Sequence, residues 1–255
     1  MFVQARAGRI YVDDAGKGDL PIVFVHSLAG NVGHWTAQLE HVREYASAIA
    51  FDLRGHGQST LPDDGDYSLE ACAEDISAVM DALGLDDCVL VGHSLGAAIA
   101  TVFACGQPER VLGLLLVDPV GDQRLASDEM QKFLVALDSP RYEPIIRDYW
   151  QTIAGPDPDL REQLLHDLDH TPKEAVLGML RALNRTNLTE AIREYDGPKL
   201  SIVTPLNEFP FSLHRVDPDL PYKVFPGTGH WLQIERPDAF NVLLDDFTLS
   251  HGLRR

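Results

Sequence analysis

Short apolar runs alternate with amphipathic segments through the first half of the chain. Runs of this length, bounded by glycine or polar residues, predict strands that are buried on both faces. Ser68 is a predicted N-cap, after which apolar residues recur at helical spacing until Gly84 ends the pattern. Strands separated by helices predict βαβ units, and hence a parallel sheet covered on both faces. The predicted strands of this half are 21–26, 47–52, 88–91 and 111–117.

The middle of the chain breaks this pattern. Between 121 and 187 the sequence indicates helices interrupted by prolines, with no strand-like run. Two more strand-like runs and a closing helix follow. We therefore predict one α/β core formed by residues 1–120 and 188–255, with residues 121–187 inserted as a helical cap. The later predicted strands are 199–204 and 222–225.

Composition narrows the range of partners. The 255 residues include 21 Lys and Arg against 39 Asp and Glu, a formal charge of −18. This negative charge opposes binding to nucleic acid or to an anionic membrane, and no stretch approaches the roughly 20 apolar residues that span a bilayer. The three cysteines form no CxxC pair, and residues 1–18 lack the apolar core of a signal peptide. We expect a cytoplasmic protein with no nucleic-acid or membrane partner.

The strongest chemical signal is the sequence Val-Gly-His-Ser-Leu-Gly at 91–96. It contains a G-x-S-x-G pentapeptide between a predicted strand and an apolar helical pattern, which is the context of a nucleophile elbow. Such a sharp turn leaves no room for side chains two residues on either side, and Gly92 and Gly96 meet that requirement. The turn would expose the Ser94 hydroxyl at a helix N-terminus, where negative charge is favoured. Ser94 is the predicted nucleophile.

A serine nucleophile needs a base and donors for the oxyanion. Among the ten histidines, His230 follows the last predicted strand and a glycine-rich loop, and it comes well after Ser94 in the chain. We predict His230 as the general base. The backbone N–H of Leu95, the residue after the nucleophile, is one expected oxyanion donor. The N–H of Leu28, in the loop after the strand at 21–26, is the other.

These motifs resemble those of the α/β-hydrolase superfamily, in the branch of esterases, lactonases and C–C bond hydrolases with a helical cap. The resemblance implies a mostly parallel, doubly wound sheet and a serine–histidine site that needs no cofactor or metal. One departure is Ser27, where the family usually has glycine after the histidine; its side chain would narrow the pocket or form a hydrogen bond within it. The similarity covers nearly the whole chain and is carried by residues 26–30, 52–59, 92–96 and 229–230.

Three residues compete as the acid that should orient His230. By the resemblance, an aspartate is expected at the end of the strand at 199–204, and counting along the family pattern places Asn207 there. If the loop at 205–208 is shifted by one residue relative to the family pattern, Glu208 occupies the position of the acid instead. Alternatively, Asp118 at the end of the fourth predicted strand supplies the carboxylate, as in some lipases of this fold. The third possibility is a dyad with Asn207, whose amide carries no charge to stabilise the imidazolium.

The three tryptophans, together with Ser27, are candidate residues of the substrate pocket. Trp35 follows the oxyanion loop, Trp150 lies in the predicted cap, and Trp231 follows the candidate base. Aromatic side chains at a boundary between cap and core suit an apolar acyl or aryl group. Core packing is the competing interpretation for Trp35.

The predicted activity is hydrolysis of a small carboxylic ester or lactone through an acyl group on Ser94. The negative surface disfavours anionic substrates at a distance, so a neutral ester is expected. The alternatives are C–C bond hydrolysis at the same serine–histidine site, or a slowly reacting ligand-binding or receptor protein of this fold. No metal site is predicted, because His166 and His170, although four residues apart, lack the carboxylate–histidine motif of a metal centre.

Overall fold

A computed structural model describes residues 1–6, 8–126 and 128–253 of the chain. All six strands predicted from apolar runs are present, with ends within two residues of the predicted ones. Two further strands come before them, where buried and exposed residues alternate and no apolar run indicates a strand. In the described ranges the strands are β1 (Phe2–Ala5), β2 (Gly8–Gly16), β3 (Pro21–Val25), β4 (Ser47–Phe51), β5 (Cys88–His93), β6 (Val111–Val117), β7 (Lys199–Val203) and β8 (Tyr222–Val224).

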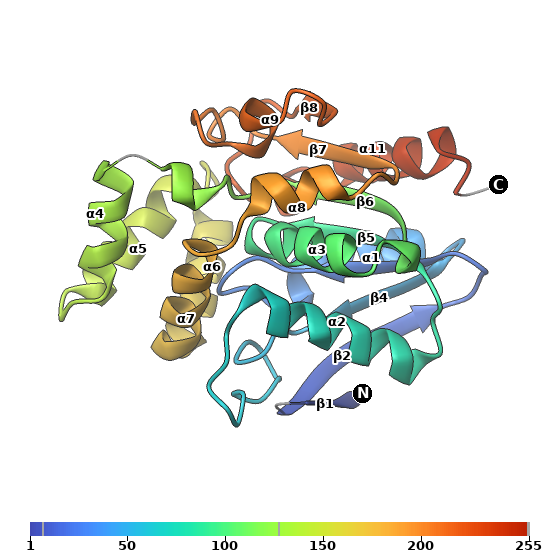
Figure 1. The fold of residues 1–255 in the computed structure, drawn as a ribbon, viewed down its shortest axis with the longest axis horizontal. Coiled ribbons are helices and arrows are strands. Elements are labelled where there is room, and N and C mark those ends of the chain that lie inside the picture. The colour runs from blue at the N-terminus through green and yellow to red at the C-terminus, as the bar shows by residue number, and fades with distance from the viewer. Residues whose placement is uncertain (7, 127, 254–255) are drawn as a thin grey trace.

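These strands form one sheet in the order β1-β2-β4-β3-β5-β6-β7-β8 (Figure 1). Neighbouring pairs from β4 to β8 are parallel, whereas β2 pairs antiparallel with both β1 and β4. Every residue of β3 and β5 is buried, as expected of central strands covered on both faces. The mostly parallel, doubly covered sheet predicted from the sequence is confirmed. Because β5 is central, the residues that follow it lie in the middle of the sheet's carboxyl edge.

Helices cover both faces of the sheet. In the described ranges they are α1 (Thr36–Val42), α2 (Leu69–Leu83), α3 (Leu95–Gly106), α4 (Asp128–Leu137), α5 (Tyr142–Ile153), α6 (Pro158–His170), α7 (Lys173–Leu183), α8 (Leu188–Glu194), α9 (Leu213–Val216), α10 (Leu232–Glu235) and α11 (Pro237–Ser250). One face is covered by α2, α3 and α8, and the opposite face by α1 and α11 (Figure 1). Each face therefore has its own apolar cluster.

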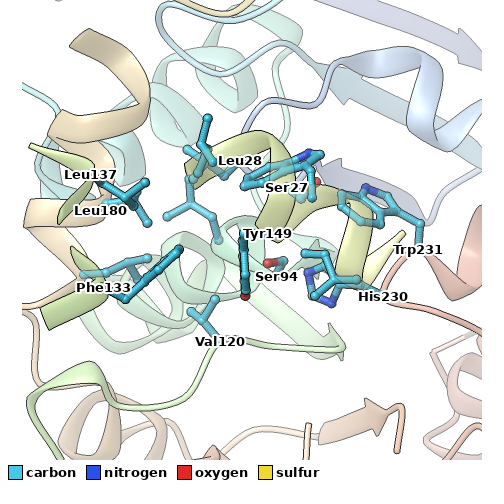
Figure 2. A pocket seen from close by; sticks show the side chains of 15 residues that line it. Ser27, Leu28, Ser94, Val120, Phe133, Leu137, Tyr149, Leu180, His230 and Trp231 are labelled. Atoms are coloured by element: carbon cyan, nitrogen blue, oxygen red, sulfur yellow. The ribbon is translucent and has the colours of Figure 1, made fainter. Parts of the chain in front are cut away.

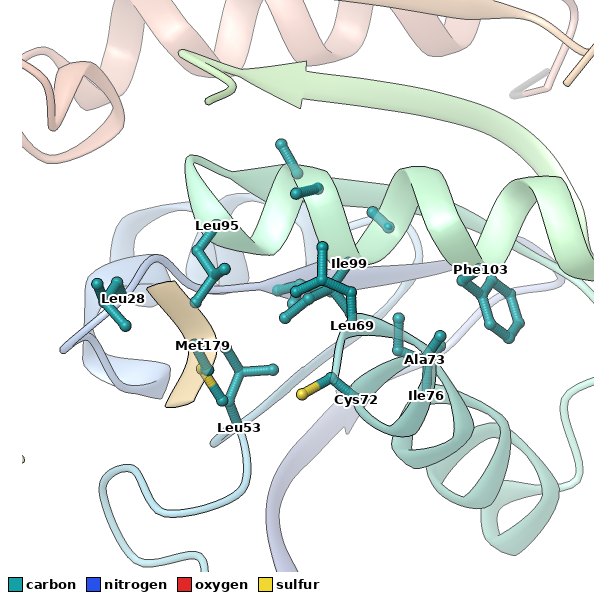
Figure 3. Close-up of a cluster of buried hydrophobic side chains, with 14 of the residues drawn as sticks. Leu28, Leu53, Leu69, Cys72, Ala73, Ile76, Leu95, Ile99, Phe103 and Met179 are labelled. Atoms are coloured by element: carbon teal, nitrogen blue, oxygen red, sulfur yellow. The ribbon is translucent and has the colours of Figure 1, made fainter. Parts of the chain in front are cut away.

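The packing of α2 against α3 supports the carboxyl end of β5. Ser68 caps α2 as predicted, since its hydroxyl accepts a hydrogen bond from a backbone N–H of the first turn, and Gly84 ends the helix at φ 68°. Cys72 of α2 and Ile99 and Phe103 of α3 belong to one buried cluster (Figure 3). The same cluster includes residues at the start of α3, so the turn between β5 and α3 rests on a close-packed base.

The chain between β6 and α8 contains helices α4 to α7 and, in its described part, no strand. Pro158 lies at the first position of α6 and Pro172 is the N-cap of α7, so both prolines begin helices rather than interrupt them. In Figure 1 these helices lie to the left of the sheet, on the side toward which β7 points.

Polar contacts join this helical segment to the rest of the molecule at several points. Where the segment begins, the buried Asp122 accepts hydrogen bonds from Thr189 of α8, at 3.2 Å from the backbone N and 2.7 Å from Oγ1. The two ends of the segment are therefore in contact. Farther along, Asp167 of α6 pairs with the buried His34, with 3.0 Å between Oδ2 and Nε2. His34 belongs to the short 3-10 helix Val32–Trp35 that follows β3.

Candidate active site

Ser94 lies in the turn between β5 and α3, with a strained backbone at φ 54° and ψ −114°. The glycines on either side have no room for a side chain. A Cβ on Gly92 would lie 2.5 Å from the carbonyl oxygen of Gly96, and one on Gly96 would lie 2.3 Å from the carbonyl oxygen of Val25. The turn thus has the geometry that the pentapeptide predicts, and β3 packs directly against its second glycine.

The ring of His230 is held by a carboxylate at the end of a neighbouring strand. His230 Nδ1 lies 2.6 Å from Oδ2 of Asp118, which follows β6. Only 2% of the Asp118 side chain is exposed, and its backbone has φ 40°. The backbone N–H of His230 donates to the carbonyl of Ile153 in α5, at 2.9 Å. The core and the inserted helices therefore both position the histidine.

The carboxylate of Asp118 accepts three further hydrogen bonds. Thr204, after β7, donates its backbone N–H at 2.8 Å and its hydroxyl at 3.0 Å. The side-chain amide of Asn207 donates to Oδ1 at 3.3 Å and to the carbonyl of Pro119 at 2.7 Å. Ser212 in turn donates its hydroxyl to the Asn207 side-chain oxygen at 2.7 Å, which fixes the orientation of the amide. These donors hold the carboxylate in one position against the imidazole.

Glu208, the competing carboxylate, lies outside this cluster. Its side chain is 40% exposed and pairs with Arg215, whose hydrogen bond lowers the pKa of the Glu208 carboxyl. The one-residue shift considered for this loop does not occur, because Asn207 is the residue that turns toward Asp118. Of the three candidates, Asp118 is therefore the carboxylate that contacts His230, with Asn207 behind it.

Hydrogen bonds of His26 hold the loop after β3, which contains the predicted oxyanion donor Leu28. The backbone N–H of Leu53 donates to Nε2 of His26 at 2.9 Å, so His26 donates from Nδ1 to the carbonyl of Ser27 at 2.7 Å. Burial lowers the pKa of His26 well below its ordinary value, which agrees with this neutral form. Leu28 and Leu95 follow Ser27 and Ser94, respectively, and line the same cavity as both serines. Their roles as donors remain a prediction.

A cavity of about 70 Å³ lies beside Ser94 and His230 (Figure 2). Its walls come from both the sheet core and the inserted helices, and they are mostly apolar. The contributing side chains of α4, α5 and α7 include Phe133, Leu137, Ile146, Trp150, Leu180 and Leu183. An apolar group of modest size is the occupant that such a lining favours.

A second, more open cavity of about 250 Å³ adjoins the same two residues. Its lining also includes Asp118 and Asn207. Tyr149 of α5 lines both cavities, and in Figure 2 its ring lies next to Ser94. Nothing in the sequence singles out Tyr149, because apolar and aromatic residues at helical spacing indicate only that a helix docks on the core.

Two of the three predicted tryptophans line the smaller cavity. Trp150 and Trp231 belong to its wall, with ring centroids 6.1 Å apart. The assignment of Trp35 to the pocket is wrong. Its side chain is fully buried against Phe24 and Phe240, at centroid distances of 5.1 and 6.3 Å. It lies on the sheet face that α1 and α11 cover, so core packing is the correct interpretation.

His93, the residue before Ser94, packs against His230. Their ring centroids are 4.7 Å apart, and His93 Nε2 lies 2.9 Å from the His230 carbonyl oxygen. Nε2 must be the protonated nitrogen, because a carbonyl can only accept, and Nδ1 faces the side-chain amide of Gln233 at 3.3 Å. Burial first, and the neighbouring His230 second, lower the pKa of His93 well below its ordinary value. His93 is therefore a neutral support beneath the catalytic loop.

Among the described residues, no group of three or more His, Cys, Asp or Glu side chains is placed to hold a metal ion. His166 and His170 stack on each other on α6, with centroids 4.0 Å apart. None of the described helices combines the length and the apolar character needed to cross a membrane.

Known proteins with similar sequences and structures point to one family. The 2-hydroxymuconate semialdehyde hydrolase of Pseudomonas putida is 27% identical, over 96% of this chain and 92% of that protein. The dihydrolipoyllysine-residue acetyltransferase component of the acetoin cleaving system of Cupriavidus necator is 26% identical over 90% of this chain, which spans 63% of that longer relative.

The solved structure of Est816, described as an N-acyl homoserine lactone degrading enzyme, superposes with a TM-score of 0.85. It is 25% identical and covers 97% of this chain and 100% of its own. The sequence model of the alpha/beta hydrolase fold matches residues 21–198, the part of the chain that holds the sheet from β3 to β6, the nucleophile turn and the inserted helices. With this match and the eight-stranded sheet, the chain belongs to the alpha/beta hydrolase fold family.

Proposed function

We propose that the protein hydrolyses small carboxylic esters or lactones through an acyl group on Ser94. The observation that carries this proposal is the 2.6 Å contact between Asp118 and His230 at the cavity that Ser94 also lines. A carboxylate, an imidazole and a serine at one cavity are the groups that acyl transfer requires. The strained turn that exposes Ser94 is typical of the nucleophile in this fold.

In the proposed reaction, His230 Nε2 takes the proton of Ser94 as Oγ attacks the substrate carbonyl carbon. The N–H groups of Leu28 and Leu95 stabilise the oxyanion. When the intermediate collapses, His230 gives that proton to the leaving alcohol oxygen. A water molecule then gives a proton to His230 and attacks the acyl carbon, and the second collapse returns the proton to Ser94 and releases the acid. Asp118 holds the Nδ1–H tautomer and stabilises the imidazolium.

The two cavities suggest where the parts of the substrate lie. The smaller one contains both predicted oxyanion residues and is apolar, which suits the acyl group. The larger one adjoins His230 and Asp118 and is more open, which suits a departing alcohol that takes its proton from His230. We propose that α4 to α7 act as a cap that closes the acyl side. The lactone substrate named for Est816 is consistent with this class of reaction.

C–C bond hydrolysis is the second candidate, because one relative of nearly the same length is a 2-hydroxymuconate semialdehyde hydrolase. Both reactions use the same serine–histidine pair, so substrate panels separate them. We expect turnover of p-nitrophenyl esters and of γ-lactones to exceed that of vinylogous diketones. The opposite ranking would replace ester hydrolysis by the second candidate.

A fluorophosphonate probe tests the proposed function directly. We expect covalent labelling at Ser94, located by mass spectrometry of the peptide, together with hydrolysis of p-nitrophenyl esters of short acyl chains. Ser94→Ala is the matched control and should lose both the label and the activity. A folded wild-type protein that takes up no label would overturn the assignment of Ser94 as a nucleophile.

A further inference from the structure

Ser27, in the loop after β3, places a hydroxyl at the smaller cavity. The residue is 1% exposed and lines the smaller cavity, together with Ser94, Leu28 and Leu95. Its Oγ has no hydrogen-bond partner among the described residues. Buried hydroxyls are normally paired, because an unpaired one has lost its hydrogen bonds to water without replacement. Because the hydroxyl of Ser27 lies at the wall of the cavity and forms no hydrogen bond with the described protein residues, we infer that it forms one with the substrate.

Covalent geometry limits which substrate atom this can be. The predicted oxyanion donor is the N–H of Leu28, and its nitrogen is four bonds from Oγ of Ser27. With standard bond lengths and angles these two atoms lie within about 5 Å of each other in any rotamer. A substrate atom that bonds to Oγ is therefore close to the carbonyl oxygen. It belongs to the scissile ester group itself or to a substituent on the carbon next to the carbonyl.

The rest of the cavity favours a hydrogen-bond acceptor at that place. The walls contributed by the inserted helices are apolar apart from the hydroxyl of Tyr149 and the indole N–H of Trp150, so few groups on them can bind a polar substituent of the substrate. The indole Nε1 of Trp231, at the same cavity, is a second buried donor without a partner among the described residues. An indole N–H can only donate. Both unpaired groups are thus suited to an oxygen that accepts.

We propose that Ser27 selects esters whose acyl chain carries an oxygen on the carbon next to the carbonyl. The chemical class is that of 2-oxo, 2-hydroxy and 2-alkoxy acids, in which the hydroxyl of Ser27 donates to the substituent oxygen. This inference rests on the proposed acyl transfer at Ser94. In the proposed reaction the N–H groups of Leu28 and Leu95 donate to the oxygen of the scissile carbonyl. The hydroxyl of Ser27 therefore donates to the substituent oxygen.

The test uses two p-nitrophenyl esters of nearly equal shape, methoxyacetate and butanoate, which differ by an ether oxygen in place of a methylene group. The ratio of their kcat/KM values, divided by the ratio of their rates of alkaline hydrolysis, measures recognition of that oxygen. We expect this corrected ratio to exceed one for the wild type and to fall about tenfold in Ser27→Ala, the magnitude of one hydrogen bond.

Ser201→Ala is the matched control. Ser201 lies in β7, and its buried Oγ also has no partner among the described residues, but it lines neither cavity at Ser94. The control should leave the corrected ratio at the wild-type value. A corrected ratio that is unchanged in Ser27→Ala, whether both rates fall equally or neither falls, would overturn the proposal. Since that result still requires hydrolysis and labelling of Ser94, it is distinct from failure of the proposed function, in which the wild type does neither.

Discussion

Asn207 donates its side-chain amide to the carboxylate of Asp118, across 3.3 Å, at the ends of two adjacent parallel strands. Asn207 occupies the position where the family resemblance places the acid, and Asp118 lies at the end of β6, one strand nearer to the nucleophile. The same edge of the sheet thus offers two places from which a carboxylate can approach His230. In this chain the carboxylate that contacts His230 is at one, and an amide that orients it is at the other.

The assignment of the acid leads to the first prediction. Asp118→Asn should reduce kcat by about 10⁴-fold, because an amide neither fixes the reactive tautomer of His230 nor stabilises its cation. Glu208→Gln, which changes an exposed carboxylate paired with Arg215, should keep kcat within about twofold of wild type. Both are measured by p-nitrophenyl ester hydrolysis at saturating substrate. The reverse result, with Glu208→Gln inactive and Asp118→Asn active, would contradict the assignment.

Exchanging the two side chains gives a second prediction. The double variant Asp118→Asn with Asn207→Asp moves the carboxylate to the neighbouring strand end and keeps one acid and one amide in contact. Since residue 207 lines the cavity that contains His230, we expect the double variant to recover at least about tenfold of the kcat lost in Asp118→Asn.

The single variant Asn207→Asp is the comparison for this exchange. It places two carboxylates in contact in a buried site, where they repel each other, and should be less stable than wild type. If the double variant is no more active than Asp118→Asn alone, position 207 cannot carry the acid in this chain.

The close packing of the nucleophile turn leads to a third prediction. A Cβ on Gly96 would lie 2.3 Å from the carbonyl oxygen of Val25 and 2.4 Å from that of His26, so Gly96→Ala must displace the end of β3. We expect a loss of about 1–3 kcal/mol in the free energy of unfolding, together with loss of activity. Gly106→Ala, at the end of α3 where a Cβ meets nothing within 4 Å, should be at least as stable as wild type. Urea unfolding of both variants checks this contrast.

Three buried histidines give a fourth prediction, on pH dependence. Burial lowers the pKa of His26 and His93 well below the ordinary value, and that of His56 to about 4. Below about pH 6.5 these rings take up protons in the unfolded chain but not in the folded one, so stability falls as the pH decreases. Each ring contributes up to about 1.4 kcal/mol per pH unit to the fall in the free energy of unfolding. The contribution of His56 ends near pH 4, where its ring takes up a proton in the folded protein as well.

The variant His56→Gln isolates one of these contributions. Its free energy of unfolding, measured in urea from pH 7.5 to 5, should decrease less steeply than that of wild type by about 1.4 kcal/mol per pH unit below pH 6.5. Parallel curves for the two proteins would show that His56 takes up its proton equally in both states.

The central sheet could be predicted because its strands are buried throughout and therefore appear as apolar runs. The strands β1 and β2 could not, because antiparallel strands at the side of the sheet mix buried and exposed residues and so form no apolar run. Ser94 and its two glycines were predictable from a local steric requirement within five residues.

The acid and the pocket depended on contacts between distant parts of the chain. Asp118 and Asn207 both follow strands that pair side by side, and the sequence does not show which of them contacts His230. Trp35 illustrates the same difficulty, because its position after the oxyanion loop does not reveal which face of the sheet its ring covers. The location of Tyr149 between two cavities depends on how α5 docks, which helical spacing does not specify.

The contact between Asp122 and Thr189 has a consequence for how much change the fold tolerates. Because the two ends of the inserted helical segment meet, the path of the sheet is independent of what lies between them. Loops whose ends are already adjacent tolerate changes of length at little thermodynamic cost. The segment can therefore change in sequence or length with little effect on β5, β6 and the loop after β8, which carry Ser94, Asp118 and His230.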